Sequence, residues 1–390
     1  MRGGGKQYPG YTGSSFLRLQ EGFHQDGPLW RPDPHCTLPR PCNPHGFGGC
    51  RDNERDENGI IIHKYGPHIF HTDYREVFEY LSRFTEWREY QHRVLGSIDG
   101  RLVPLPFNLT SMRELLPESL SRRLEEKLLE KHPHGARVHI LELMEEDDPD
   151  LRFLADYIYR KVFLNYTMKQ WGLKPEEIDP EVTGRVPVVL SNDDRYFQDT
   201  YQAVPLRGYT GMIGRMLDHP NIKLMLNTSH DEVLELRDGS IFVMGSEFRG
   251  KLVFTGKIDE LFNYRYGELP YRSLDFRFEA HDMEWFQEAA TINYPNNYDY
   301  TRITEFKHLH PVRSDRTVIV KEYPCSHVRG ENEACYPIFT EETREMYRRY
   351  LELAADYDNL VLVGRLAEYR YYDMDDIVKR SLDVFREMIL

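Results

Sequence analysis

Glycine and proline interrupt the first fifty residues of this 390-residue chain so often that no regular element is expected there. The segment holds ten glycines and seven prolines, and its apolar residues show no sustained periodicity. Proline fixes φ and removes a backbone donor, while glycine raises the entropic cost of ordering, so neither a helix nor a central strand fits. We expect residues 1–47 to be disordered or at most loop, and the folded protein to begin near Asp52.

Composition limits the classes of function. The net charge of -14 argues against a nucleic-acid surface. The sequence contains no run of 18 apolar residues, so no membrane span is expected. The chain starts without a signal-peptide pattern. Five cysteines fit free thiols in a reducing cytoplasm better than a disulfide framework. The abundant tyrosine, 26 residues, suits interfaces and sugar-nucleotide clefts because it joins an apolar face to a hydroxyl.

Hydrophobic periodicity predicts a helical middle, followed by strands and a final βα unit. Helices are predicted over residues 74–90, 112–131 and 150–165, from Gly208, and after Arg365 to the end. Strands are predicted over residues 60–62, 222–226, 240–243, 252–254, 272–279, 288–294, 317–323 and 359–363, with a hairpin over 93–104. The turn of that hairpin is Asp99-Gly100, a pair favoured where both central residues take positive φ.

Two stretches could form a floor and a wall for planar ligands. Residues 59–73 run from a short buried strand into Gly66-Pro67, which bends and stiffens a loop carrying His68 and His71. Tyr166 and Trp171 lie five positions apart before a glycine and could stack on a base. Taken alone, the first stretch is better explained by histidines that satisfy backbone groups, and the second by core aromatics at a helix end.

Two further stretches could bind phosphate. Residues 300–305 alternate as a strand that carries Arg302, whose planar fork could grip a diphosphate or form a surface ion pair. Residues 359–375 read as a strand, Gly364-Arg365 and a helix, which resembles a phosphate cradle. The sequence shows no metal-ligand spacing, no nucleophile elbow and no strand leading into a GxGxxG turn.

Together these stretches resemble the UDP-galactopyranose mutase family. The motifs are GPHIFHTD, YTMKQWG, RVPV with NDDRYF, YTRITE, KEYP and GRLAEYRYYDMD, in order over residues 48–390. The resemblance implies an α/β fold with an FAD-binding Rossmann-like domain, an inserted helical domain and an antiparallel β-sheet domain. The expected ranges are 48–90, 208–258 and 340–390 for FAD, 105–184 for the helices, and 91–104, 185–207 and 259–339 for the sheet.

The resemblance implies an isomerase that interconverts UDP-galactopyranose and UDP-galactofuranose without net redox change, for cell-wall polysaccharide biosynthesis. Reduced FAD, with NADPH or NADH as reductant, would attack the galactose anomeric carbon through N5 and displace UDP. A cytoplasmic homodimer is expected. The alternatives are an FAD-dependent oxidoreductase of the amine-oxidase or desaturase type, or an inactive remnant that binds UDP-sugars.

The resemblance also implies roles for particular residues. The catalytic group would be His68 and His71 beside the flavin, Arg302 and Asp373. The substrate group would be Phe163, Tyr166 and Trp171 at the uridine, Tyr201, Arg302, Tyr323 and Tyr371 at the diphosphate, Asn293 at the galactose, and Arg185 in a lid over residues 185–201. The cofactor group would be Gly48, Gly49, His68, Gly364, Arg365, Asp373 and Met374, and no metal is expected.

The sequence departs from the family pattern in two places. Residues 1–47 bear no likeness to the strand, GxGxxG turn and helix that begin the family, and we interpret them as a shifted-frame or rearranged version of that unit. Val189 stands where relatives carry a second lid arginine facing the diphosphate. Because valine cannot donate a hydrogen bond, lower substrate affinity is expected, and Val189→Arg is expected to raise turnover.

Overall fold

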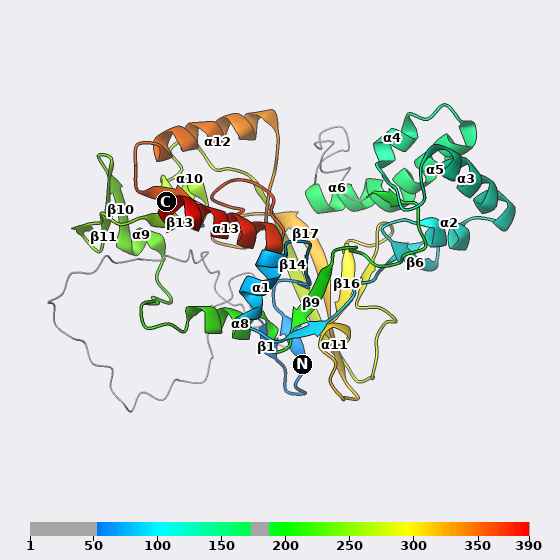
Figure 1. Cartoon of the computed structure of the whole chain (residues 1–390), viewed down its shortest axis with the longest axis horizontal. Coiled ribbons are helices and arrows are strands. Elements are labelled where there is room, and N and C mark those ends of the chain that lie inside the picture. The colour runs from blue at the N-terminus through cyan, green and yellow to red at the C-terminus, as the bar shows by residue number, and fades with distance from the viewer. Residues whose placement is uncertain (1–52, 173–186, 390) are drawn as a thin grey trace, which may run out of the picture.

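The computed structural model describes residues 53–172 and 187–389, and it is a mixed α/β structure. Helices α2 to α6 gather at one end of the molecule, a twisted sheet crosses the middle, and α10, α12 and α13 lie at the other end (Figure 1). The segment 1–47, expected to be disordered, lies outside the described residues. The division into three domains with the predicted boundaries stays a prediction.

The central sheet has seven strands in the order β18-β14-β17-β16-β15-β5-β6. The strands are β5 (Val94–Ile98), β6 (Arg101–Leu105), β14 (Tyr271–His281), β15 (Thr291–Asn293), β16 (Arg302–Glu305), β17 (Thr317–Ser326) and β18 (Tyr336–Pro337). All neighbours are antiparallel except β15 and β5, which are parallel, so the sheet predicted as antiparallel is mixed. Asp99 and Gly100 both have positive φ, as the predicted hairpin requires.

Smaller sheets surround it. One antiparallel pair is β1 (Asn53–Arg55) with β2 (Ile61–His63), and another is β7 (Arg137–Val138) with β8 (Val188–Val189). A three-stranded sheet joins β3 (Phe70–Thr72), β9 (Tyr201–Pro205) and β4 (Trp87–Glu89), and a second joins β10 (Leu234–Arg237), β11 (Ser240–Val243) and β12 (Ser246–Glu247). The strands β13 (Leu252–Phe254) and β19 (Leu360–Leu362) form a parallel pair.

The helices cover the sheets and form the helical end. They are α1 (Arg75–Ser82), α2 (Leu109–Leu115), α3 (Glu118–Lys131), α4 (Ile140–Met144), α5 (Pro149–Ile158), the π-helix η2 (Tyr159–Leu164), α6 (Asn165–Trp171), α8 (Gly208–Leu217), α9 (His230–Val233), α10 (Ile258–Leu261), α11 (Phe306–Leu309), α12 (Glu341–Ala354) and α13 (Met374–Ile389). None within the described residues is both long and apolar enough to cross a membrane.

Local chemistry explains where the helices of the middle begin and break. The helix predicted over residues 112–131 is two helices, because Pro117 lacks a backbone donor and Leu116 before it is extended. The helix predicted over 150–165 starts where the Asp148 side chain accepts the N–H groups of Asp150 and Leu151. It continues through η2 into α6, so a single rod leads from the helical core towards the central sheet.

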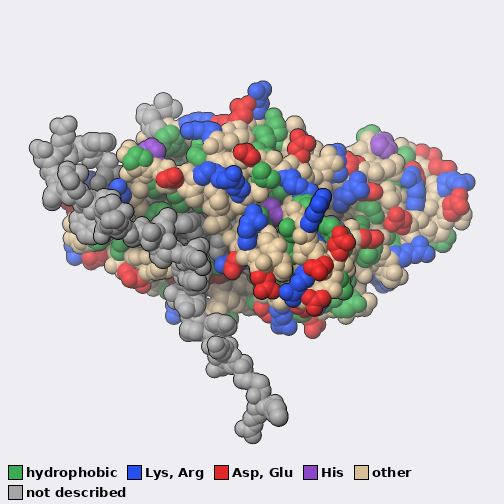
Figure 2. Space-filling model, turned by 90° about the horizontal axis from the view of Figure 1, so that it is seen from below, with side chains coloured by type: hydrophobic (Ala, Val, Ile, Leu, Met, Phe, Trp, Pro, Cys, Tyr) green, Lys and Arg blue, Asp and Glu red, His purple; other side chains and the backbone are tan. Residues whose placement is uncertain are grey.

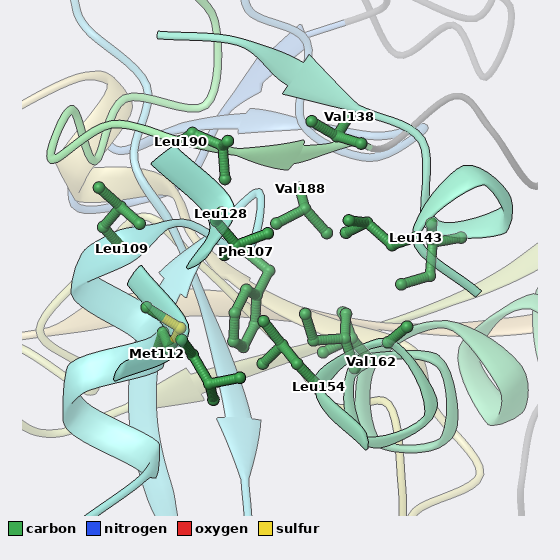
Figure 3. Packing of buried hydrophobic residues seen from close by; sticks show 14 of the residues in the cluster. Phe107, Leu109, Met112, Leu128, Val138, Leu143, Leu154, Val162, Val188 and Leu190 are labelled. Atoms are coloured by element: carbon green, nitrogen blue, oxygen red, sulfur yellow. The ribbon is translucent and has the colours of Figure 1, made fainter. Parts of the chain in front are cut away.

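The helical end has its own hydrophobic core. In Figure 3, Phe107 lies at the centre of the cluster, with Met112, Leu154 and Val188 around it. Val188 belongs to β8, which follows the helices by sixteen residues, and Leu190 beside it is also buried in this core. The segment after residue 187 is therefore packed onto the helices by two buried side chains.

Two predicted elements are wrong. The helix expected to reach Tyr90 ends at Ser82, and β4 follows, because Trp87 stacks on Phe70 and its strand pairs with β9. Residues 222–226 alternate like a strand but form none, and Leu224 and Met225 are 40% and 50% exposed. A strand needs a neighbour for its backbone groups, and this segment pairs with none of the described strands.

Acidic and basic side chains are interspersed over the face of the molecule shown in Figure 2. Some of the ion pairs that they form, such as Arg122 with Glu118 and Arg160 with Asp156, are exposed and join residues one helical turn apart. Pairs of this kind contribute only a few tenths of a kcal/mol each, so we attribute the stability of the helical end to its apolar core.

Adjacent residues of α5 test this attribution. We expect Leu154→Ala to lower the free energy of unfolding by about 3 kcal/mol, because Leu154 is fully buried and its removal leaves a cavity. We expect Phe153→Ala to change it by less than about 0.5 kcal/mol, because Phe153 is 49% exposed. Urea denaturation followed by circular dichroism measures both. Equal effects of the two substitutions would contradict this assignment of the core.

Candidate active site

A cavity of about 730 Å³ lies where the helical end, the central sheet and the start of α13 meet. This volume is in the range of small-molecule sites. It is lined by eleven of the predicted residues, which come from segments far apart in the sequence: His68, His71, Phe163, Tyr166, Trp171, Asn293, Arg302, Arg365, Tyr371, Asp373 and Met374. The cavity is therefore the candidate active site.

The loop that begins at Gly66 forms one wall of the cavity. Gly66 has φ +83°, and a Cβ there would lie 3.0 Å from the Phe276 ring and 3.3 Å from Glu322. Only glycine combines this backbone conformation with so close an approach to β14 and β17. The loop is thus held against the central sheet, and its residues through Ile69 face the cavity.

Two buried histidines hold this loop from behind. The backbone N–H of His68 donates to Nδ1 of His63 at 3.0 Å, so His63 carries its proton on Nε2 and donates it to Nε2 of His310 at 2.9 Å. Burial, followed by the neighbouring His310 and His68, holds the pKa of His63 well below its usual value. Burial also lowers the pKa of His310, to about 4. Both rings are therefore neutral at physiological pH, and the chain of hydrogen bonds fixes the position of His68.

His71 lies at the other end of the same loop. Its ring stacks on Phe197 at 3.6 Å, and its Nδ1 lies 3.3 Å from a carboxylate oxygen of Asp199. Burial alone would lower the pKa of His71, but Asp199 outweighs burial with help from Asp373 and Asp375, so the pKa is raised. A protonated His71 adds positive charge to the cavity wall.

The predicted aromatic platform is fixed to the central sheet at the end of α6. Gly172 caps this helix with φ +65°, and Arg272 of β14 donates to the carbonyls of Gln170 and Lys169. A Cβ on Gly172 would lie 2.7 Å from a nitrogen of Arg272, so glycine is required there. The ammonium of Lys169 donates to three carbonyls of residues 294–300, at 2.6 to 3.2 Å. These contacts hold Tyr166 and Trp171 at the cavity.

A cross-strand ion pair forms the charged part of the site. Arg302 of β16 and Glu322 of β17 are directly opposite each other, with Nε and Oε2 3.0 Å apart. The Glu322 side chain is 1% exposed and that of Arg302 is 26% exposed. Burial alone would lower the pKa of Arg302, but Glu322 and then Tyr166 raise it, so the guanidinium keeps its charge. A buried carboxylate thus orients a positive charge that also faces the cavity.

A second arginine lies near the start of α13. Arg365 donates to the carbonyls of Tyr372 and Cys335, and its guanidinium lies 4.7 Å from the centre of the Tyr371 ring. The Tyr371 hydroxyl donates to Asp373 at 3.0 Å. Tyr336 stacks parallel to Tyr371 and meets Trp171 edge-on, which joins this corner of the cavity to the aromatic platform.

Three buried acceptor oxygens that belong to cavity-lining residues have no hydrogen-bond partner among the described residues: Gln170 Oε1, Asn293 Oδ1 and Glu322 Oε1. Buried polar atoms in proteins are nearly always paired. Oxygens of this kind would be satisfied by the hydroxyl and N–H donors of a polar ligand. Among the described residues, no group of three or more His, Cys, Asp or Glu side chains could hold a metal ion.

Comparisons with known proteins identify the family. A sequence profile described as UDP-galactopyranose mutase matches residues 161–371. The UDP-galactopyranose mutase of Mycoplasma pneumoniae is 34% identical over 342 residues, covering 86% of each chain. This chain belongs to the UDP-galactopyranose mutase family.

A second relative and a solved structure are also similar to this chain. A dTDP-fucopyranose mutase of Escherichia coli is 32% identical to this mutase family member, over 87% of this chain and 88% of the relative. A crystal structure of reduced UDP-galactopyranose mutase superposes with a TM-score of 0.63 at 16% identity, covering 88% of this chain and 86% of that one. The second likeness shows the shared mixed α/β fold. The curated relatives are enzymes, and this member of the mutase family is likewise an isomerase.

The structure brings neither Tyr323 nor Tyr201 to the cavity. Tyr323 follows Glu322 in β17, and neighbours in a strand point to opposite faces. Its ring instead lies under Arg277, 4.0 Å from the guanidinium. Tyr201 stacks on Phe78 of α1 at 4.3 Å. Neither residue therefore lies with Arg302 and Tyr371 at the cavity, and the diphosphate role of both stays a prediction.

Gly364 is not followed directly by a helix. Five of the six residues after it form turns, and α13 begins only at Met374. The Gly364 N–H donates to the Glu368 carboxylate at 2.9 Å, so a side chain of the protein takes the place predicted for a phosphate. The cofactor role of Gly364 stays a prediction, and Gly48, Gly49 and Arg185 lie outside the described residues.

Several residues that line the cavity were given no role from the sequence, among them His92, Arg137, Glu322 and Tyr336. Glu322 could have been found, since alternation of β17 together with the pairing to Arg302 places it on the cavity face. Burial, followed by Arg302 and His71, lowers the pKa of His92 to about 3. Nothing in the local sequence of Tyr336 or Arg137 distinguishes them from surface residues.

Val189 lies in β8 and is 4% exposed. Its N–H donates to the Phe107 carbonyl at 2.8 Å, and Leu190 donates to the Ala136 carbonyl at 2.9 Å. Val189 is not among the residues that line the cavity. The expectation that Val189→Arg raises turnover stays a prediction, and an arginine introduced there must first leave this buried position.

The pair of His71 and Asp199 predicts a pH dependence of stability. Because the pKa of His71 is raised in the folded state, its protonation stabilises the fold. This contribution is fully present at pH values below 6.5, the ordinary pKa of histidine, and is lost as the pH rises through the folded-state pKa. The pKa of Asp199, which burial would raise, is lowered by His71, so the carboxylate remains charged throughout this range. We expect Asp199→Asn to cost about 1 kcal/mol at pH 5.5 and less at pH 8.5.

Urea denaturation of both proteins at the two pH values measures the difference. Asp275→Asn is the matched control, because Asp275 pairs with Arg277, which does not titrate in this range. The same cost of Asp199→Asn at both pH values would show that His71 is not its charged partner.

The cap of α6 gives another prediction. We expect Gly172→Ala to lower the free energy of unfolding by about 1–2 kcal/mol, because alanine is strained at φ +65°. The added Cβ also displaces Arg272, so we expect weaker binding of UDP, measured by calorimetry. Gly245→Ala is the control, since Gly245 has φ +79° and open space around it. Equal UDP affinities of both variants would contradict the role of the cap.

Proposed function

We propose that this chain interconverts UDP-galactopyranose and UDP-galactofuranose with a reduced flavin as its cofactor. The observation that carries the proposal is one cavity lined by an aromatic platform, a buried arginine and a histidine-bearing loop. The aromatic platform suits a nucleotide base, the arginine suits a diphosphate, and the histidine-bearing loop suits a planar ring system. The membership in the mutase family gives the substrate class.

The residues present fit the ring end of a flavin. The rigid loop from Gly66 to Ile69 offers a floor for a planar group, and Arg365, Asp373 and Met374 lie at the same cavity. When bound, a reduced flavin supplies an electron-rich N5 atom that can attack an anomeric carbon and later leave it unchanged in oxidation state. We propose FAD specifically, with NADPH or NADH as reductant.

The chain itself would position the substrate and neutralise charge. Tyr166 and Trp171 would stack on the base, because they are held by Arg272 and Lys169 and need not be ordered on binding. Arg302 would stabilise the negative charge that develops on the departing diphosphate. Glu322 is a positioning residue, since it contacts Arg302 and has one oxygen directed at no partner in the described residues.

A second candidate substrate is dTDP-fucopyranose, because a relative with that name is nearly as similar as those named for UDP-galactopyranose. Both substrates are sugars on a pyrimidine nucleoside diphosphate, so the platform and Arg302 serve either. They differ in the base, the ribose and the sugar C6 hydroxyl. We also propose, from the family resemblance, a cytoplasmic homodimer that supplies galactofuranose for polysaccharides.

The test is turnover by the purified chain loaded with FAD and reduced once with dithionite. We expect conversion of UDP-galactofuranose to UDP-galactopyranose, followed by liquid chromatography, over many turnovers per reduction. Faster conversion of dTDP-fucofuranose would favour the second candidate. Consumption of one oxidant or reductant per product would instead favour an oxidoreductase, and binding of UDP without turnover would favour an inactive remnant.

Substitution of Arg302 tests its role in this reaction. We expect Arg302→Lys to lower kcat/KM by about 100-fold, because lysine keeps the charge but loses the planar fork that donates at fixed angles. Arg277→Lys is the control, since Arg277 lies on β14 with 59% of its side chain exposed and pairs with Asp275 outside the cavity. A loss no larger than that of the control would exclude Arg302 from transition-state stabilisation.

A further inference from the structure

Among the residues that the structure describes, three arginines line the cavity: Arg137, Arg302 and Arg365. Arg302 is paired with the buried carboxylate of Glu322 at 3.0 Å. Arg365 donates to two backbone carbonyls and stacks on aromatic rings. The charge of Arg302 is thus largely balanced by the protein, although a bound diphosphate carries more than one negative charge.

Arg137 differs from the other two arginines in its surroundings. Its side chain is exposed, and within the described residues its hydrogen-bond partner is Oε1 of Gln198, a neutral group that is also exposed. The nearby Asp199 carboxylate is already committed to His71. Arg137 therefore brings a positive charge to the edge of the cavity that no carboxylate of the described residues neutralises by direct contact.

The backbone holds Arg137 firmly although its side chain is exposed. It lies in β7, where Val138 beside it is 2% exposed in the helical core. Successive residues of a strand point to opposite faces, so burial of Val138 directs Arg137 away from the core. Two hydrogen bonds just before Arg137, from the Gly135 N–H to the Leu190 carbonyl and from the Leu190 N–H to the Ala136 carbonyl, fix the register of the two strands.

The residue directly opposite Arg137 in this pair is Val189. Side chains at opposed positions of an antiparallel pair lie on the same face, with Cβ atoms about 5 Å apart. Position 189 is the lid position at which an arginine was expected to face the diphosphate. An arginine on the neighbouring strand β7 can reach the same side of the cavity, because its long apolar stem carries the charged group away from the backbone.

We infer that Arg137 is a second substrate-contacting cation that binds the diphosphate of the sugar nucleotide at the cavity mouth, across the strand pair from Val189. The inference rests on the proposed function, because it assumes a nucleoside diphosphate in this cavity. The hydrogen bond to Gln198 would be exchanged for one to a phosphate oxygen on binding. Hydrogen bonds to charged partners are stronger than those to neutral amides, so the exchange is favourable.

The experiment compares binding of UDP and of uridine to the full chain by isothermal titration calorimetry. We expect Arg137→Gln to weaken UDP binding about tenfold at low ionic strength and to leave uridine binding unchanged, since uridine has no phosphate. Arg137→Lys should recover part of the affinity, because a lysine retains the charge without the fork. Thermal unfolding of each variant shows that the fold is kept.

Arg122→Gln is the matched control, because Arg122 is an exposed arginine of the same helical group that pairs with Glu118 on α3. Equal UDP affinities of Arg137→Gln and the wild-type chain would overturn the inference and leave the proposed function intact. Equal losses for UDP and uridine would also overturn it, since they would indicate a distorted pocket rather than a lost phosphate contact. Absence of UDP binding to the wild-type chain would overturn both proposals at once.

Discussion

The cross-strand pair of Arg302 and Glu322 is the interaction on which the candidate site depends. A carboxylate that is almost completely buried in β17 has a large desolvation cost, and the guanidinium opposite in β16 offsets it. The pairing fixes both the register of these strands and the direction of the positive charge. The loop at Gly66, where a Cβ would lie only 3.3 Å from Glu322, is positioned against the same pair.

Elements from distant parts of the chain converge on this pair because side chains tie them to the central sheet. Arg272 of β14 caps α6, and Lys169 of α6 binds three carbonyls of the segment between β15 and β16. These are contacts of charged groups with backbone oxygens, which depend on direction more than apolar contacts do. The aromatic platform is therefore placed by the sheet, while the helical core stabilises the end of the molecule behind it.

Sequence reasoning succeeded where a local rule determines the conformation. The Asp99-Gly100 turn, the glycine that ends α6 and the final amphipathic helix are set by backbone preferences and periodicity within a few residues. It failed where a partner decides the outcome. Residues 222–226 have a strand pattern without a neighbouring strand, and Glu322 was given no role although it lies opposite Arg302 on the adjacent strand. The position of Arg137 relative to the cavity depends on its pairing with Val189, which lies about fifty residues later in the sequence.

The parallel pairing of β5 with β15 has a consequence for synthesis on the ribosome. Val94 pairs with Thr291, about 200 positions later, so the hairpin of β5 and β6 leaves the ribosome long before its neighbour exists. At roughly 5–20 residues per second, the delay is on the order of 10–40 s. During that time β5 presents an unpaired edge next to a hydrophobic helical core that can already form. Nascent chains of this protein thus pass through an aggregation-prone stage, when a chaperone that shields strand edges would matter most.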